Sequence, residues 1–239
     1  MRKSAACLVM ILVLCLGSLF SARAETGLET FRVRNGDPES KKIAITMDDV
    51  NEPEWVWKTV ELCREYGITM TFFPNGRNIF EEDADHWRDV VDSGCEIGSH
   101  GWDHRSLKKI ETRTEMFWEL GKVQQVLDQV LGYHYPIRWY RPTYGEMGDQ
   151  YEIVKKFGYD HAILWTVSET DPDKAFPLVG NGSILLYHAR KRDYDCLVQL
   201  IPRLLEAGFE PVTVSGLFGF DPPEISEELY IYNKEDYLK

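Results

Sequence analysis

The stretch Ile43-Ala44-Ile45-Thr46-Met47-Asp48-Asp49-Val50 joins a short apolar run to two adjacent carboxylates. An apolar run of this length predicts a buried strand. Neighbouring side chains on a strand point to opposite faces, so Asp48 and Asp49 are expected to do different jobs. Like charges held this close repel each other, so we expect a cation beside or between them. The alternative for this stretch alone is a strand that ends in a solvated acidic turn.

The rest of the chain alternates apolar strands with amphipathic helices. Further strands are predicted over Ile68–Phe73, Cys95–Gly98, Ile137–Tyr140, His161–Val167, Ser183–His188 and Pro211–Val214, and helices over Glu54–Tyr66, 80–92, 111–131, Tyr151–Phe157 and 194–207. Such alternation is typical of βαβ units and a parallel sheet. Without a Gly-x-Gly-x-x-Gly turn, the pattern favours a distorted (β/α)7-8 barrel over a dinucleotide-binding sheet. Chemistry is then expected at the carboxyl ends of the strands.

The chain is predicted to hold one domain, preceded by a signal peptide and a lead-in and followed by a tail. Residues 1–24 have the basic start, apolar run and small-residue cleavage site of a signal peptide. The apolar run is short for a stable membrane span, so we expect export to the periplasm or the extracellular space. Residues 25–42 are expected to be an extended lead-in, 43–220 the domain, and 221–239 an acidic and aromatic tail that packs on the surface or frays.

Composition excludes some classes of partner. A formal net charge of −12 and a pI near 5 argue against nucleic acid. Aromatic residues make up 13% of the chain, which suggests that some of them stack on sugars while most lie in the core. Three cysteines follow the cleavage site, Cys63, Cys95 and Cys196, so one disulfide is possible, but their spacing fits no zinc site.

Polar residues cluster where the predicted strands end. The third strand runs into the stretch His100-Gly101-Trp102-Asp103-His104, and the sixth ends at His188. Two histidines together with a carboxylate form an ordinary ligand set for catalytic zinc, with one position left open for water. Imidazole and carboxylate also suit neighbouring first-row metals.

These motifs resemble those of the polysaccharide deacetylases, the carbohydrate esterase family 4 or NodB-homology domains, over roughly residues 40–217. The family motif Thr-Phe-Asp-Asp-Gly is matched by Thr46–Val50, and His-(Ser/Thr)-x-x-His by His100–His104. An Arg-x-Pro-Tyr-like motif is matched by Arg141–Gly145, and Leu-x-His by Leu186–His188. Each motif alone is weak, but four in the right order at strand ends are a strong signal.

The resemblance implies a metal site and an acid–base pair. By it, Asp49, His100 and His104 hold one divalent metal, zinc in the first place, with cobalt or nickel as alternatives. Asp48 is the general base, and Arg141 pairs with Asp48 and keeps it ionised.

The resemblance also assigns the remaining roles. The backbone N–H of Tyr144 stabilises the oxyanion, and His188 protonates the leaving group. Trp165, Leu186 and Trp102 are expected to contact the substrate.

Two departures concern the loops that carry the metal ligands. Val50 stands where the family has glycine, so we expect the turn after the acidic pair to be built differently. Gly101 stands where the family has a hydroxyl residue that braces the histidine loop.

A third departure concerns the fourth family motif, Trp-x-x-Asp-x-x-Asp-Trp. Ser168 and Pro172 replace its first Asp and second Trp. Asp171 or Glu169 could take over the missing acidic role. Trp102 or Trp139 could supply the aromatic surface that the second Trp provides.

By the resemblance, the chain is a metal-dependent hydrolase that removes acetyl groups from an N- or O-acetylated polysaccharide, such as peptidoglycan or a chitin-like or xylan-like glycan. One alternative is a catalytically impaired carbohydrate-binding protein on the same scaffold. Another is a metal-free amide hydrolase of the same superfamily.

Overall fold

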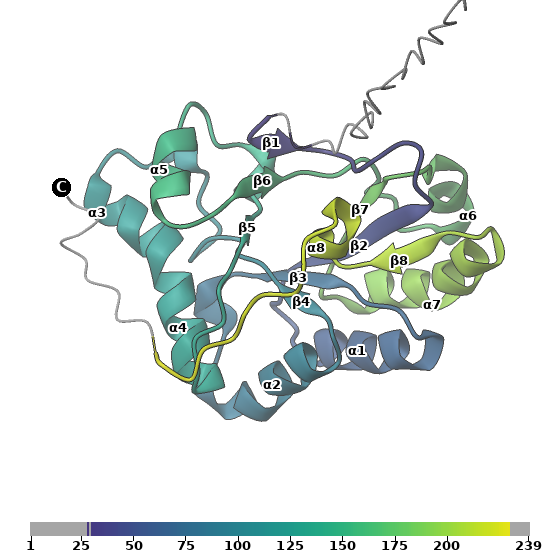
Figure 1. Ribbon diagram of the computed structural model, residues 1–239, viewed down its shortest axis with the longest axis horizontal. Helices are drawn as coiled ribbons and strands as arrows, with labels where there is room; N and C mark the ends of the chain where they lie inside the picture. Colours follow the sequence, from purple (N-terminus) through teal and green to yellow (C-terminus); the bar gives the residue numbers. More distant parts are fainter. Residues whose placement is uncertain (1–27, 29, 230–239) are drawn as a thin grey trace, which may run out of the picture.

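Two parallel sheets form a distorted barrel in the computed structural model, which describes residue 28 and residues 30–229 (Figure 1). The larger sheet has the order β4-β3-β2-β7, and β8 pairs with the first residues of β2. The smaller sheet has the order β1-β6-β5. Single parallel bridges from Ser99 to Tyr140 and from Val167 to Leu185 join the two sheets and close the barrel. The strands are β1 (Arg32–Val33), β2 (Lys42–Asp49), β3 (Thr71–Pro74), β4 (Glu96–Ile97), β5 (Trp139–Tyr140), β6 (His161–Ile163), β7 (Ile184–His188) and β8 (Glu210–Val212).

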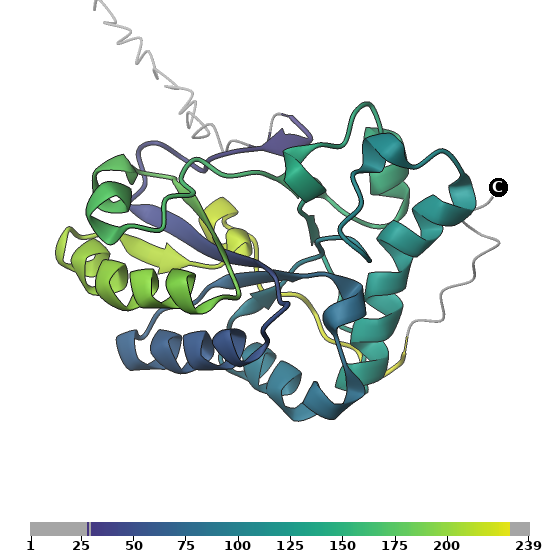
Figure 2. The ribbon, with the colours of Figure 1, turned by 180° about the vertical axis from the view of Figure 1, so that it is seen from behind.

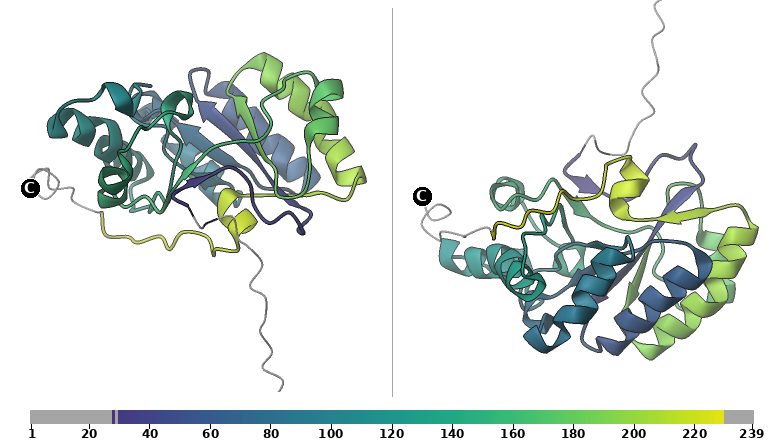
Figure 3. Two further views of the ribbon diagram at one scale, coloured as in Figure 1. Left: turned by 90° about the horizontal axis from the view of Figure 1, so that it is seen from above. Right: turned by 60° about the horizontal axis from the view of Figure 1, so that its bottom comes forward.

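Helices cover the outside of this barrel. The α-helices are α1 (Glu54–Tyr66), α2 (Ala84–Asp92), α3 (Arg113–Met116), α4 (Lys122–Leu131), α5 (Tyr151–Lys156), α6 (Pro172–Ala175), α7 (Lys191–Glu206) and α8 (Val214–Phe218). The contacts run from α7 to α1, from α1 to α2 and from α2 to α4, so these four helices form one layer (Figures 2 and 3). Short turns lie between them: η1 (Gly76–Asn78), η2 (Glu81–Asp83), η3 (Leu107–Lys109), η5 (Thr143–Gly145), η6 (Phe176–Leu178) and the π-helical η4 (Phe117–Gly121).

The predicted parallel α/β barrel is confirmed, and most differences lie at element ends. Helix α1 has the predicted bounds and ends at Gly67 in the left-handed conformation. The strand predicted over His161–Val167 ends at Ile163, because Val167 has left β5 and bridges to β7. The helix predicted over 111–131 is interrupted by η4, since the backbone there widens to a π-turn.

The flanking segments also contact the barrel. Strand β1 lies within the expected lead-in and pairs with β6. In the expected tail, Ser226 bridges to His134. The expected signal peptide and residues 230–239 lie outside the described residues.

Two further findings bear on the sequence analysis. The three cysteines that follow the predicted cleavage site are all buried, free thiols. Within the described part of the chain, none of the helices combines the length and the apolar character that a membrane crossing needs.

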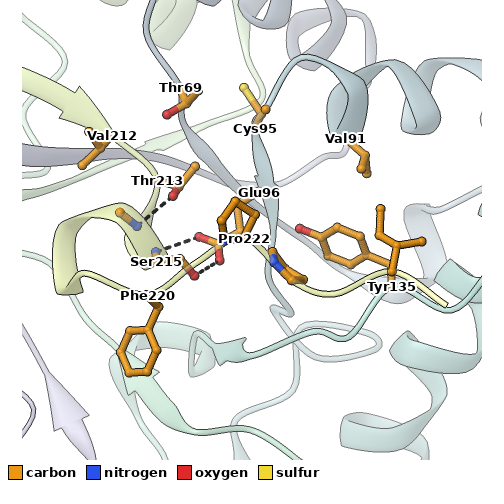
Figure 4. Close-up of a pocket in the computed structure, with 14 residues that line it drawn as sticks. Thr69, Val91, Cys95, Glu96, Tyr135, Val212, Thr213, Ser215, Phe220 and Pro222 are labelled. Atoms are coloured by element: carbon orange, nitrogen blue, oxygen red, sulfur yellow. Dashed lines mark hydrogen bonds between the residues drawn. The ribbon is translucent and has the colours of Figure 1, made fainter.

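A buried carboxylate ties the barrel together at the amino ends of β3 and β4. Glu96 accepts hydrogen bonds from the Thr71 hydroxyl (2.9 Å), the Trp139 indole N–H (2.9 Å) and the Ser215 backbone N–H (3.1 Å), and a short one from the Ser215 hydroxyl. These donors come from β3, β5 and α8. A pocket of about 340 Å³ lies beside this carboxylate (Figure 4). All four bonds of Glu96 are internal, so we assign it a structural role.

Replacing this carboxylate by its amide should therefore destabilise the fold. Glu96→Gln sets an NH2 group against donors, so at least one buried donor loses its acceptor, at a cost of about 1–3 kcal/mol. Urea unfolding measures the loss, and Glu210→Gln on the exposed edge of β8 is the control. Equal unfolding midpoints for Glu96→Gln and wild type would contradict this role for Glu96.

Candidate functional site

The parallel register brings the predicted site residues to one end of the barrel. Asp48 lies directly opposite His188 in the β2–β7 pair. The bridge from Ser99 to Tyr140 sets His100 beside Arg141, and the His100 Nδ1 lies 2.7 Å from the Arg141 carbonyl oxygen. Residues far apart in the sequence thus converge because each directly ends or follows a strand.

Asp48 is held by a buried guanidinium. Arg141 is fully buried and its Nη1 donates to the Asp48 Oδ1 at 2.7 Å and to the Thr46 hydroxyl at 2.6 Å. Its Nε donates to the Ile163 carbonyl at 3.1 Å, and the guanidinium lies 4.2 Å from the centre of the Phe73 ring. The structure therefore places the cation expected beside the acidic pair against Asp48.

Three potential metal ligands face one another beside this pair. The Asp49 Oδ1 lies 3.5 Å from the His100 Nε2 and 3.3 Å from the His104 Nε2. Zinc bound by such atoms at its usual bond lengths would separate them by about 3.3 Å, close to these two carboxylate–imidazole distances. All three ligand atoms lie within 4.8 Å of one another. The Asp49 Oδ1 is buried and has no hydrogen-bond partner among the described residues. A carboxylate oxygen in this situation fits a cation ligand.

The two imidazoles are prepared to bind metal through Nε2. The carbonyl of Arg141 accepts a hydrogen bond from His100 Nδ1, which fixes the tautomer with its lone pair on Nε2. Burial lowers the pKa of His104, which favours the neutral, ligating form of its ring. The residues present therefore fit a divalent metal.

Backbone strain is concentrated around these ligands. In the described part of the chain, the non-glycine residues with positive φ are Asp49, Val50, His104 and Tyr144. The Val50 N–H donates to the Asp48 carbonyl at 2.9 Å, which makes Asp49, at φ 71°, the centre of a γ-turn. Such conformations persist only where the surrounding structure enforces them, and they cluster at functional sites.

The turn after the acidic pair holds a β-branched residue where the family has glycine, and the expectation of a differently built turn stays a prediction. Val50 itself adopts the left-handed conformation, with φ 57°, that the family glycine would take readily. Its side chain is buried in the main core cluster, and this packing offsets the strain of a β-branched residue at positive φ.

His188 has an acidic partner that the sequence analysis missed. The His188 backbone N–H donates to the Asp193 Oδ1 at 2.8 Å, and its ring Nδ1 lies 3.7 Å from the same oxygen. The side chain of Asp193 is fully buried. This carboxylate raises the pKa of His188 against the opposing effect of burial. An acidic residue in the first turn of the helix that follows a site strand was the signal available.

Among the described residues, the hydrogen bonds and ion pairs of Glu169 and Asp171, the acidic candidates from the fourth motif, go to neighbouring residues and not to Arg141 or His188. Glu169 accepts from the backbone N–H groups of Thr170 (2.8 Å) and Asp171 (2.9 Å). Asp171 caps α6 and pairs with Lys174 at 3.2 Å. Both carboxylates therefore serve their own loop.

The expected aromatic residues occupy different environments. Tyr144 is 67% exposed, and its ring meets that of His104 edge-on at 4.8 Å. Trp102 is partly buried and its ring lies against Gly76. Tyr144 thus presents an open aromatic face at the site, whereas Trp102 is partly committed to packing.

The other residues considered for substrate contact are less exposed than Tyr144. Trp165 is partly buried and packs against Gly145. Leu186 is buried within β7. The suggestion that Trp139 supplies an aromatic surface is wrong, because its side chain is fully buried and bonds Glu96 at the amino ends of the strands.

Curated proteins that resemble this chain in sequence are named as peptidoglycan deacetylases. The chain is 26% identical over 191 residues to the peptidoglycan-N-acetylmuramic acid deacetylase PdaC of Bacillus subtilis, which covers 76% of this chain and 39% of that protein. It is 28% identical over 219 residues to a peptidoglycan-N-acetylglucosamine deacetylase of Bacillus cereus, covering 82% of this chain and 95% of that protein. The chain spans about two fifths of the length of the first curated relatives it matches.

A solved structure and a family match complete the comparison. The crystal structure of a mutant carbohydrate esterase family 4 pseudoenzyme with restored activity, from a Bacillus anthracis protein, superimposes with a TM-score of 0.69 at 25% identity. It covers 78% of this chain and 71% of that chain. Residues 35–162, more than half of the chain, match the family described as polysaccharide deacetylase. The chain belongs to the polysaccharide deacetylase family.

Proposed function

We propose that this chain is a metal-dependent deacetylase that hydrolyses the N-acetyl groups of a peptidoglycan-type glycan. The observation that carries the proposal is the convergence of the Asp49, His100 and His104 ligand atoms with Asp48 and His188 at one barrel end. The relatives named as peptidoglycan deacetylases support the substrate class. Together with the expected signal peptide, they support a site of action in the periplasm or outside the cell.

The metal, zinc in the first place, would be held by the three ligands and would supply Lewis acidity toward a water and the acetyl carbonyl. Asp48 accepts the proton of the attacking water, and its Oδ2 is available for this because Oδ1 bonds Arg141. The backbone N–H of Tyr144 donates to the developing oxyanion. His188, kept protonated with the help of Asp193, donates a proton to the leaving amine.

Two alternatives remain as outcomes of the test. A binding protein without turnover is favoured by the altered fourth motif and by the likeness to a pseudoenzyme structure. It would bind acetylated glycan and release no acetate. A metal-free amide hydrolase would be active with no stoichiometric metal.

The two adjacent carboxylates should separate metal binding from turnover. We expect Asp49→Ala to abolish zinc binding, because it removes the carboxylate ligand. Asp48→Asn should retain zinc, and loss of the general base should lower acetate release by about 10²–10⁴-fold. Elemental analysis and acetate release from acetylated peptidoglycan fragments and chito-oligomers measure the two effects.

Asparagine is chosen at position 48 because its amide oxygen can still accept the hydrogen bond from the buried Arg141, which alanine cannot. A melting curve for each variant checks that it folds. The division of roles is wrong if both variants lose zinc to the same extent. Wild-type protein that binds zinc but releases no acetate from any acetylated glycan would favour the binding protein.

Removing the partner of His188 should change how activity depends on pH. Asp193→Asn takes away the carboxylate that raises the pKa of His188, so this pKa should fall toward the ordinary value of about 6.5. Since the general acid must be protonated, the alkaline limb of the rate profile should move to lower pH. NMR titration of the His188 ring gives the pKa, and acetate release gives the profile.

The matched control is Asp195→Asn on the same helix, whose carboxylate is exposed and pairs with Lys191. It should leave both the pKa of His188 and the rate profile unchanged. An unaltered His188 titration in Asp193→Asn would rule out the pairing.

A further inference from the structure

The π-helical segment η4 places a carboxyl group beneath the loop that carries the two histidine ligands. Glu119 lies in this segment and is 2% exposed. Single π-turns within helices occur often at functional sites, because the extra residue redirects a side chain. The π-turn that interrupts the helix predicted over 111–131 thus contains a buried acidic residue, Glu119.

The carboxyl group of Glu119 contacts each residue between His100 and His104. Its Oε1 accepts a hydrogen bond from the Trp102 backbone N–H at 3.1 Å, and its Oε2 accepts a longer one from Asp103 at 3.4 Å. A Cβ added to Gly101 would lie 2.1 Å from the Oε1. The carboxyl group thus fills the space that a side chain at position 101 would need.

From this geometry we infer that Glu119 is a positioning residue that braces the histidine loop and sets the separation of the two imidazole ligands. The inference rests on the metal site of the proposed function. Glu119 accepts from the backbone N–H groups of Trp102 and Asp103, the two residues before His104, whose backbone is strained at φ 66°. The family's hydroxyl brace is absent at Gly101, and Glu119 supplies hydrogen-bond acceptors to the same loop. Outer partners of this kind orient metal ligands without touching the metal.

The protonation of Glu119 guides the choice of variant. Burial, and then the neighbouring Asp103, raise the pKa of Glu119 to about 8. Glutamine matches the neutral carboxyl group in shape and keeps one acceptor oxygen, which serves the shorter bond from the Trp102 N–H. Its NH2 group replaces the oxygen that makes the longer contact with Asp103. Alanine removes the acceptors, and aspartate is one methylene too short to reach the loop.

The test is zinc affinity of the full chain, measured by competition with a chromogenic chelator. We expect Glu119→Ala to weaken zinc binding by about 10–100-fold, as loss of an outer partner does in other metal sites. Glu119→Gln should bind zinc almost as tightly as wild type. If Glu119→Ala fails to fold, Glu119→Asp should show the same loss of affinity.

A control separates positioning from general stability. Asp128 is also buried, in the neighbouring helix α4, where it bonds His134, Gln124 and the Tyr135 N–H. Asp128→Asn should lower the melting temperature and leave zinc affinity unchanged. Equal loss of zinc affinity in Asp128→Asn and Glu119→Ala would assign the effect to stability and overturn the inference.

A double-mutant cycle tests the contact itself. Gly101→Ala should weaken zinc binding, because the new methyl group displaces the Glu119 carboxyl group in addition to straining a residue at φ +79°. In the Glu119→Ala background only the strain remains, so the same substitution should cost less. Equal costs in both backgrounds would show that Glu119 does not occupy this space.

The outcomes distinguish this inference from the proposed function. If wild-type protein binds no zinc, the proposed metal-dependent function fails. If wild type binds zinc and Glu119→Ala binds it equally well, only the brace is wrong. If Glu119→Gln binds zinc as weakly as Glu119→Ala does, the carboxyl group of Glu119 does not act by accepting hydrogen bonds.

Discussion

The buried guanidinium of Arg141 joins the site to the barrel. It bonds Asp48 and Thr46 on β2, the Ile163 carbonyl at the end of β6, and lies on the ring of Phe73 in β3. These contacts connect the larger sheet with the smaller one. Removing one partner of a buried ion pair leaves an uncompensated charge, which typically costs about 3–5 kcal/mol. The same interaction therefore orients the proposed general base and holds the two sheets together.

The sequence allowed much of this site to be predicted because its residues stand at strand ends. In a parallel barrel all carboxyl ends meet at one end, so local strand assignments were enough to bring His100, Arg141 and His188 near Asp48. The bounds of α1 could be predicted because its apolar stripe ends at a glycine cap. Both inferences needed only short-range pattern and the topology of the fold.

Other features could not be predicted, because they depend on contacts between distant segments. Asp193 meets His188 only once β7 turns into α7. Its place in the first turn of that helix is a weak signal, because it follows the basic residues Arg190–Arg192 and lies outside the matched motifs. The π-turn that holds Glu119 lies within a stretch whose apolar periodicity shows no break in the sequence, so periodicity alone favours a continuous helix. Trp139 was placed at the wrong end of the barrel, since a strand pattern alone does not say where an indole N–H finds its acceptor.

The ligands of the proposed metal site are each fixed by contacts within the protein. The γ-turn sets Asp49, the carbonyl of Arg141 sets the His100 tautomer, and Glu119 bonds the loop before His104. Three of the four non-glycine residues with positive φ described in this chain are a ligand or adjoin one. Strain of this kind destabilises the chain without metal unless burial and hydrogen bonds offset it. The burial and hydrogen bonds that offset this strain involve atoms other than the ligand atoms, so the fold itself sets the ligand geometry. Metal binding then has to order fewer groups, which lowers its entropic cost.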